Sequence, residues 1–180
     1  MLYMVEMDMS HGDRLAQWHA WYEAHVDKLL TMPGFISAQR FVSIGPTLSP
    51  YLAIYSVTDE SALTNPTYTA RAGPQSASTW APFMSNWQRN LLDGVTVAAE
   101  VNSGQWIALI DRQAPDAPEL PPGFARLKPV GLDCSMVERG LRWGAQDEAP
   151  PSPAQAQGWT LRVWRPLSAQ KVASGARAGP

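Results

Sequence analysis

Residues 18–26 read Trp-His-Ala-Trp-Tyr-Glu-Ala-His-Val, and the helix that they predict ends at Met32-Pro33-Gly34-Phe35. Pro33 disfavours the helical conformation in the residue before it, and Gly34 is typical of a turn. Along this helix, apolar and aromatic residues recur at spacings of three and four, which predicts one buried stripe: Leu15, Trp18, Tyr22, His25 and Leu29. If the protein has a reactive site, we expect one of its walls here.

The segments around this helix have the composition of strands. One strand is predicted before it, at residues 2–9, and two follow at 35–44 and 51–57, close enough to form a hairpin. We then predict a short helix at 60–65 that Pro66 interrupts, a surface loop at 67–79, a second long helix at 80–92 and a fourth strand at 95–101. The order is strand, helix, strand, strand, helix, strand. This is the βαββαβ unit of ferredoxin-like α+β folds.

Beyond residue 101 the pattern is less regular. Further strands are predicted at 105–110, 124–130, 136–143 and 159–165, with proline-rich connections in between. We therefore expect a ferredoxin-like domain at 1–101, a degenerate second repeat or strand-rich extension at 102–168, and a disordered tail at 169–180.

The composition narrows the function classes. The 180 residues suffice for one ordinary domain or two small ones, and 45% of them are hydrophobic against 17% charged. The formal net charge is −2 without a basic run, which argues against a nucleic-acid partner. A single cysteine, Cys134, no leader-like start and no apolar stretch of about 18 residues indicate a cytoplasmic protein that does not span a membrane. Few solubilising charges and an uncovered sheet face predict a homodimer.

The same helix, the Met-Pro-Gly-Phe turn, Ala38-Gln39-Arg40-Phe41 and Tyr51-Leu52-Ala53-Ile54-Tyr55 resemble the EthD-like branch of the dimeric α+β barrel superfamily. The resemblance covers about residues 1–101. It implies two ferredoxin-like sheets that close into a barrel, with a pocket between sheet and helices. Members of the superfamily include cofactor-free isomerases, cyclases, dehydratases and decarboxylases, heme enzymes, oxygenases of activated aromatics, and proteins without known activity.

His25 is the first residue that could carry chemistry, because its stripe faces the sheet and an imidazole can move protons near neutral pH. The resemblance implies the acid/base role for His25 alone; the alternative is a half-buried histidine bonded to a backbone carbonyl. Tyr22, one turn earlier, could orient His25 or donate a hydrogen bond to a developing oxyanion, or it could be a core aromatic. His19 is rotated off the stripe, and we expect it nearer to solvent.

Other residues could complete a substrate site. Arg40 could hold a carboxylate with two parallel hydrogen bonds, or it could be a paired surface charge. An aromatic lining for a flat apolar substrate is predicted from Trp18, Tyr51, Tyr55, Tyr68, Trp80 and Trp87, although core packing explains most of them equally well. The six-residue spacing of His19 and His25 does not suit one metal ion, and no phosphate loop, nucleophile elbow or dinucleotide fingerprint is present, so we expect neither metal nor cofactor.

The leading hypothesis is a small cofactor-independent lyase or isomerase, of the dehydratase, decarboxylase or cyclase type. It would act on an apolar aromatic or polyketide-like metabolite, with His25 as general acid/base and Tyr22 as its helper. One alternative is a non-catalytic protein that holds a hydrophobic ligand in a catabolic pathway of aromatics. Another is a cofactor-free oxygenase of an electron-rich phenol. All three need the same pocket, so the sequence leaves them open.

Overall fold

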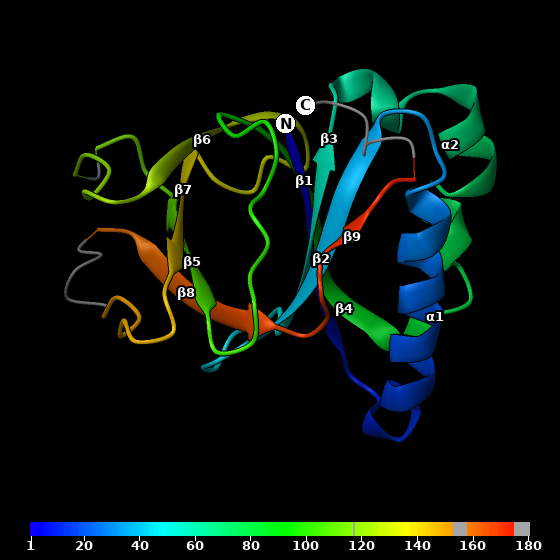
Figure 1. Ribbon diagram of the computed structural model, residues 1–180, viewed down its shortest axis with the longest axis horizontal. Coiled ribbons are helices and arrows are strands. Elements are labelled where there is room, and N and C mark those ends of the chain that lie inside the picture. Colours follow the sequence, from blue (N-terminus) through cyan, green and yellow to red (C-terminus); the bar gives the residue numbers. More distant parts are fainter. Residues whose placement is uncertain (117, 153–157, 175–180) are drawn as a thin grey trace.

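The strands of this chain form one closed barrel. The computed structural model describes residues 1–116, 118–152 and 158–174. Around the barrel the strands follow the order β3-β1-β4-β6-β7-β5-β8-β2, and β2 pairs back to β3 (Figure 1). Their bounds are β1 Leu2–Met9, β2 Phe35–Ser43, β3 Tyr51–Val57, β4 Met84–Asp93, β5 Trp106–Arg112, β6 Ala125–Leu132, β7 Glu138–Gly144 and β8 Thr160–Pro166. All described pairings are antiparallel.

The barrel consists of two groups of four strands with the same internal order. The first group runs β4-β1-β3-β2 and the second β8-β5-β7-β6, so each has its first strand between its fourth and third. The groups join where β4 pairs with β6 and β2 with β8. Closure within one chain pairs the sheet edges that would otherwise be exposed. The sheet face that led us to expect a homodimer is therefore covered by the chain itself.

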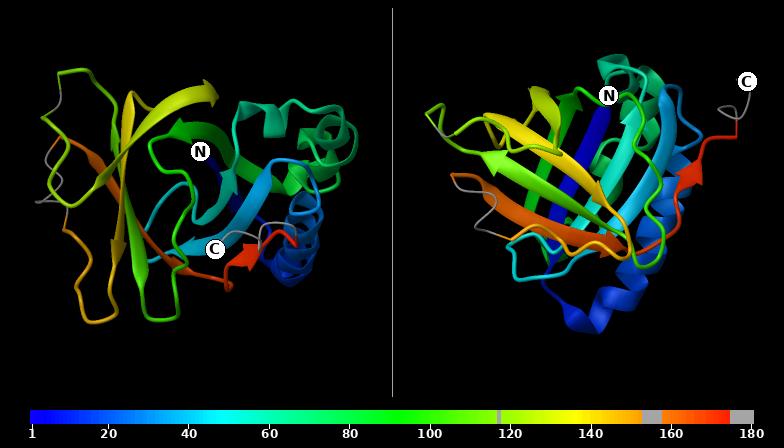
Figure 2. Two further views of the ribbon diagram at one scale, coloured as in Figure 1. Left: turned by 45° about the horizontal axis from the view of Figure 1, so that its top comes forward. Right: turned by 60° about the vertical axis from the view of Figure 1, so that its left-hand side comes forward.

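All helical segments of the described residues accompany the first group of strands. They are α1 Leu15–Leu29 and α2 Pro66–Arg71 with four short 3₁₀ turns, η1 Gly12–Arg14, η2 Glu60–Leu63, η3 Pro74–Ala77 and η4 Ala81–Phe83. They lie on the outer face of the first four strands, whereas loops alone connect the second four in the part of the chain that the structure describes (Figure 2). No helix within the described residues is long and apolar enough to span a membrane.

The side chains of strand β1 alternate between two hydrophobic cores, an outer one between the sheet and the helices and an inner one inside the barrel. Tyr3, Val5 and Met7 point outward and pack under the helices, while Met4 and Glu6 point into the barrel. The buried face of α1, formed by Trp18, Tyr22, Val26 and Leu29, covers the outer core. The helix ends at a tight turn where Gly34 has φ +87° and a Cβ would lie 2.6 Å from the Cβ of Ala62. Only glycine suits this position.

The predicted helix at 80–92 is wrong, because most of it forms strand β4. Residue Asn86 has φ +50°, and between Asp8↔Ser85 and Glu6↔Gln88 the strand contains one residue more than β1. Such a bulge shifts the alternation of side chains. The shift explains why apolar residues in this strand recur at a spacing that resembles a helix.

The predicted strand at 95–101 is also wrong, since β4 already occupies the fourth position. These residues instead lie against side chains of the barrel interior. The backbone N–H of Ala98 donates to Ser56 Oγ at 2.9 Å, and that of Val101 donates to Gln39 Oε1 at 3.0 Å. Ala98 and Val101 are buried in the inner core, which explains the apolar pattern.

The segment 67–79 was predicted as a loop, but it contains α2 and η3. Pro66 occupies the first turn of α2, where its missing N–H is not needed, and the Asn65 side chain accepts from the N–H of Tyr68 at 2.9 Å. Within the predicted disordered tail, Lys171–Val172 forms a short strand, β9, that pairs with β2. Residues 175–180 of that tail, and 153–157 of the second proline-rich connection, lie outside the described residues.

Candidate functional site

A pocket lies between the outer face of the sheet and the helical layer. Its enclosed volume is about 30 Å³, and the unoccupied space is about 410 Å³ when the open solvent at its mouth is counted. Four tyrosines from four elements line it, Tyr3 of β1, Tyr22 of α1, Tyr55 of β3 and Tyr68 of α2, and we call it the tyrosine pocket. The remaining walls are mostly apolar: Val5, Met7, Trp21, Leu29, Met84 and Trp87, with small residues of α2 and η3 at one side.

The four tyrosines are buried, none more than 5% exposed. Burial raises the pKa of Tyr22 to about 12 and also raises the pKa of the other three. The hydroxyls of Tyr3 and Tyr68 interact, as do those of Tyr22 and Tyr55. Within the described residues the Tyr55 hydroxyl completes no hydrogen bond of ordinary geometry. The pocket therefore presents phenols that stay protonated at neutral pH and have capacity to donate to a bound oxygen atom.

His25 lies at the edge of the buried stripe of α1, half-buried at the wall of the pocket. Its ring stacks on Trp21, with centroids 5.2 Å apart and planes 16° apart, and meets Tyr22 edge-on at 5.9 Å. Burial and, second, the charge of Lys28 lower the pKa of His25 to about 4. Within the described residues no hydrogen bond holds either ring nitrogen of His25, so the bond to a backbone carbonyl that the sequence left open is not formed. His25 is thus a neutral imidazole at pH 7 that can accept a proton.

The pocket brings together some of the residues that the sequence indicated. His25, Tyr22, Tyr55, Tyr68 and Trp87 line it. Trp80 lies outside the lining, with its ring 6.0 Å from that of Trp21. Of the other three indicated residues, Trp18 lies on the buried face of α1, and Arg40 and Tyr51 pack against that helix outside the pocket.

Arg40 is 3% exposed and already engaged by α1. Its Nη1 donates to Glu23 Oε1 at 2.9 Å, and its Nη2 lies 2.9 Å from His19 Nδ1. The guanidinium carbon also lies 4.2 Å from the ring centre of Tyr22. Arg40 is therefore not open to a substrate carboxylate. His19, which we expected nearer to solvent, is half-buried, and its Nδ1 lies against the Arg40 guanidinium.

Trp18 is fully buried between α1 and the sheet, where its ring centre lies 4.8 Å from that of Tyr51. These two rings fasten the helix to β3 outside the pocket. Sequence reasoning missed Tyr3 and Trp21 as pocket residues. Tyr3 shares a strand face with Val5 and Met7, and Trp21 lies one turn before His25, so alternation and i, i+4 spacing could have indicated both.

No protein-family model matches this sequence, and no curated protein matches it significantly. Its structure resembles the crystal structure of an anthrone oxidase-like protein, with a TM-score of 0.59 and 12% identity over 99% of this chain and 96% of that chain. It also resembles a chlorite dismutase-like protein, with a TM-score of 0.50 and 13% identity over 93% of this chain and 95% of that one. Both belong to the dimeric α+β barrel superfamily, and this chain has that fold. At such identities the likeness concerns the fold alone.

Proposed function

We propose that this protein is a small cofactor-independent enzyme that moves a proton on a flat, apolar aromatic or polyketide-like substrate, as a lyase or isomerase. His25 is the general acid/base, and Tyr22 with its neighbouring phenols binds the oxygen on which charge develops. The observation that carries the proposal is a neutral histidine at the wall of an apolar pocket with four protonated phenols, a histidine that makes no hydrogen bond to the described part of the chain. The resemblance of the α1 sequence to the EthD-like branch supports the same assignment.

The step is a proton transfer to a ring nitrogen of His25 from an acidic carbon or hydroxyl of the substrate. The electron pair left behind delocalises onto a substrate oxygen, which accepts hydrogen bonds from tyrosine hydroxyls. With a pKa of about 4, the His25 imidazole is entirely in its base form at pH 7, yet it is a weak base. The phenols must therefore supply much of the driving force. Return of the proton to another atom gives an isomer, and expulsion of a leaving group gives a lyase product.

The test is a His25→Ala variant assayed for exchange of the acidic carbon-bound hydrogen in D₂O, by NMR, on a panel of flat aromatic ketones. We expect a loss of about 10² to 10⁴-fold, as is typical for removal of a general base. His11→Ala is the matched control, because His11 is exposed and lies outside the tyrosine pocket. A folded His25→Ala protein with undiminished exchange on a substrate of the wild type would disprove the assignment.

A second proposal is a cofactor-free oxygenase, favoured by the fold shared with an anthrone oxidase-like protein. The same deprotonation would produce a carbanion that reacts with O₂, so that a CH₂ group and O₂ yield a carbonyl group and water. An oxygen electrode separates this reaction from a lyase or isomerase, which consumes no O₂. A non-catalytic ligand-binding protein of aromatic catabolism is the remaining alternative. It predicts binding of the same ketones without exchange or turnover.

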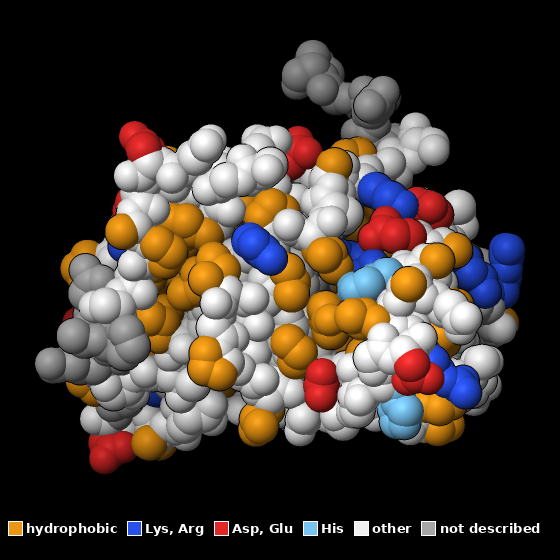
Figure 3. All heavy atoms as spheres, turned by 90° about the horizontal axis from the view of Figure 1, so that it is seen from below, with side chains coloured by type: hydrophobic (Ala, Val, Ile, Leu, Met, Phe, Trp, Pro, Cys, Tyr) orange, Lys and Arg blue, Asp and Glu red, His pale blue; other side chains and the backbone are white. Residues whose placement is uncertain are grey.

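We further propose that the protein is a homodimer and acts in the cytoplasm. A dimer would not be needed to close the barrel, so it would use another surface. The face seen from below carries scattered apolar side chains, with most of its charged side chains toward the right of the view (Figure 3). The β2–β3 hairpin contributes Ile44 and Leu48, which are 53% and 78% exposed. Analytical ultracentrifugation of wild type and Leu48→Glu tests this: a dimer that the variant abolishes supports it, and a monomeric wild type removes it.

A further inference from the structure

A second pocket opens beside Tyr3 and Tyr68. Its volume is about 240 Å³, and it lies between α2, η3 and the strands β4 and β6. Its lining is Tyr3, Leu63, Tyr68, Thr69, Gln75, Arg89 and Leu132, and we call it the Arg89 pocket. Because Tyr3 and Tyr68 also line the tyrosine pocket, the two spaces adjoin and share this pair of side chains as a wall.

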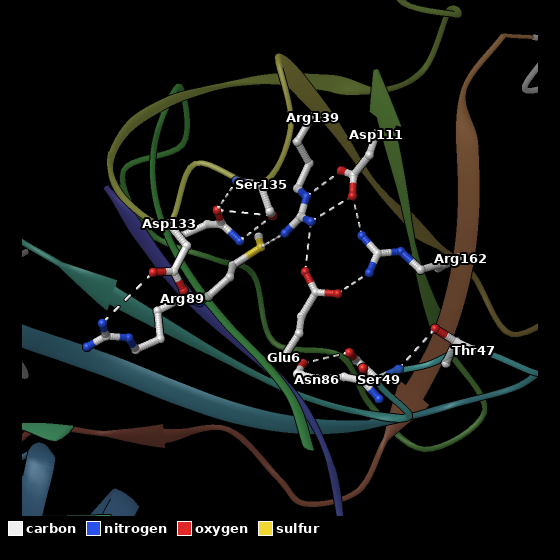
Figure 4. Close-up of polar contacts among 12 residues, drawn as sticks. Glu6, Thr47, Ser49, Asn86, Arg89, Asp111, Asp133, Ser135, Arg139 and Arg162 are labelled. Carbon is white, nitrogen blue, oxygen red and sulfur yellow. Dashed lines mark hydrogen bonds and ion pairs between the residues drawn. The ribbon is translucent and has the colours of Figure 1, made fainter. Parts of the chain in front are cut away.

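The Arg89 pocket carries a positive charge without a strong partner. Arg89 contributes the charge, and no acidic residue belongs to the lining. In the described part of the chain its guanidinium makes one ion pair, to Asp133, with Nη2 and Oδ1 3.9 Å apart. The other carboxylate oxygen of Asp133 accepts the backbone N–H of Arg89 at 2.6 Å. Figure 4 shows the Arg89 side chain reaching away from the buried charges of the barrel, with Asp133 as its one drawn partner.

Arg89 also lies beside the wall of the tyrosine pocket. Its guanidinium carbon is 5.5 Å from the ring centre of Trp87, which lines that pocket. Its charge acts on Tyr3 and Tyr68, although burial dominates the pKa of both hydroxyls. The positive charge, the exposed amide of Gln75 and the two shared tyrosines therefore border one space next to the proposed reaction site.

We propose that the Arg89 pocket is an anion subsite beside the same site, which binds the carboxylate of an aromatic acid whose ring system lies against the shared wall of Tyr3 and Tyr68. A guanidinium with free N–H groups matches a carboxylate with two parallel hydrogen bonds. The Asp133 pair, close to the 4 Å limit of an ion pair and partly exposed, offers little competition. The inference rests on the proposed function for the identity of the neighbouring pocket and narrows its substrate class to planar aromatic acids.

Equilibrium binding of a matched ligand pair tests the subsite without any need for turnover. The probes are anthraquinone-2-carboxylate and the neutral 2-(hydroxymethyl)anthraquinone, titrated by calorimetry or tryptophan quenching. We expect the wild type to bind the acid about tenfold or more tightly than the neutral analogue. Arg89→Gln abolishes this preference and leaves the affinity for the neutral analogue unchanged. Arg89→Lys retains part of the preference, because the charge remains while the paired geometry is lost.

Arg71→Gln is the control for a general change of charge, since Arg71 is exposed on α2 and lines neither pocket. It should keep the full preference for the acid. Equal affinity of the wild type for both probes, no binding of either, or an equal loss of both affinities in a folded Arg89→Gln protein would overturn the subsite. Failure of the proposed function looks different: His25→Ala retains full turnover while the preference that depends on Arg89 persists.

Discussion

The two faces of strand β1 carry different kinds of polar group, neutral ones on the outer face and charged ones on the inner face. On the outer face, Tyr3 belongs to a set of neutral phenols beside a neutral histidine and an open space. On the inner face, Glu6 is fully buried in a set of full charges. Arg139 Nη2 lies 2.7 Å from Glu6 Oε1, and its Nε and Nη2 donate to Asp111 at 2.6 and 2.8 Å. Arg162 bonds to both acids (Figure 4).

The difference indicates that the inner charged groups stabilise the barrel, whereas the outer neutral groups are available to bind a ligand. Two arginines and two acids cancel in charge, and they tie β1 of the first strand group to β5, β7 and β8 of the second. Burial alone would raise the pKa of Asp111, but Arg139 and Arg162 outweigh it and hold that pKa below its usual value. Groups held so tightly are poor catalysts. The outer face instead has uncharged groups with unused hydrogen-bonding capacity, which is suited to a ligand.

The largest effect is expected from breaking the inner set with Arg139→Met. The variant leaves two buried acids with one arginine, and loss of one member of a buried charge set typically destabilises a protein by about 3–5 kcal/mol. Urea unfolding measures the change. Arg126→Met is the control, because Arg126 is 61% exposed in its ion pair with Glu138, and we expect less than about 1 kcal/mol there. Equal effects of the two variants would contradict the structural role of the inner set.

The half-buried histidine on the outer side of the sheet should make the unfolding free energy depend on pH. The folded protein lowers the pKa of His25 to about 4 from 6.5, so the unfolded chain binds the extra proton between these values. The stabilisation is complete above pH 6.5 and is lost as the pH falls through about 4, by up to about 3 kcal/mol. His19, whose pKa is lowered by burial and by Arg40, acts in the same direction. His25→Phe should therefore reduce the slope of unfolding free energy against pH without removing it. An unchanged slope would show that His25 is not buried in its neutral form.

The Tyr55→Phe variant removes a single hydroxyl group and tests whether it serves the site or the packing of the outer face. The Tyr55 hydroxyl is buried without a complete hydrogen bond in the described part of the chain, so its removal should leave stability unchanged or raise it by about 1 kcal/mol. Exchange of substrate hydrogen should nevertheless fall about 10²-fold, because a donor to the developing oxyanion is lost. Tyr51→Phe is the control, since Tyr51 lies outside the pocket. A loss of stability without a loss of activity would assign Tyr55 to packing instead.

The sequence pattern predicted those helices and strands in which each buried side chain faces a single apolar layer. The stripe of α1 was predicted because Trp18 and Tyr22 face one apolar layer. The strands β2, β3, β5 and β8 were predicted from their composition. Strand β4 was not, because the bulge at Asn86 changes its phase. Closure of the barrel depends on β4–β6 and β2–β8 pairings between residues far apart in the chain, which no local pattern encodes.

The same limit applies to the site. His25 and Tyr22 could be chosen because they share a helix face with aromatic residues, and they do line one pocket. The sequence could not decide whether Arg40 binds a substrate or pairs with an acid. Its partner Glu23 lies on the opposite side of the α1 stripe from His25, and Glu23 contacts Arg40 only after β2 packs on the helix. The role of Arg89 depends on the Arg89 pocket, which forms only when α2 packs beside β4 and β6. In addition, the sequence pattern placed Arg89 in a predicted helix at 80–92, whereas the residue lies on strand β4.

The smallest effect is expected at charges that neither face buries. Lys171 of β9 lies 2.7 Å from Asp27 Oδ1 and 3.0 Å from Glu23 Oε2, and about a third of its side chain is exposed. Desolvation alone would lower the pKa of Lys171, but the two carboxylates together outweigh it and raise that pKa. Water nevertheless screens such exposed pairs. Lys171→Met should therefore cost about 0.5 kcal/mol at low salt and almost nothing at about 1 M, whereas the effect of Arg139→Met should persist at both. A salt-independent loss in Lys171→Met would mean that β9 fastens α1 to the barrel by packing rather than by charge.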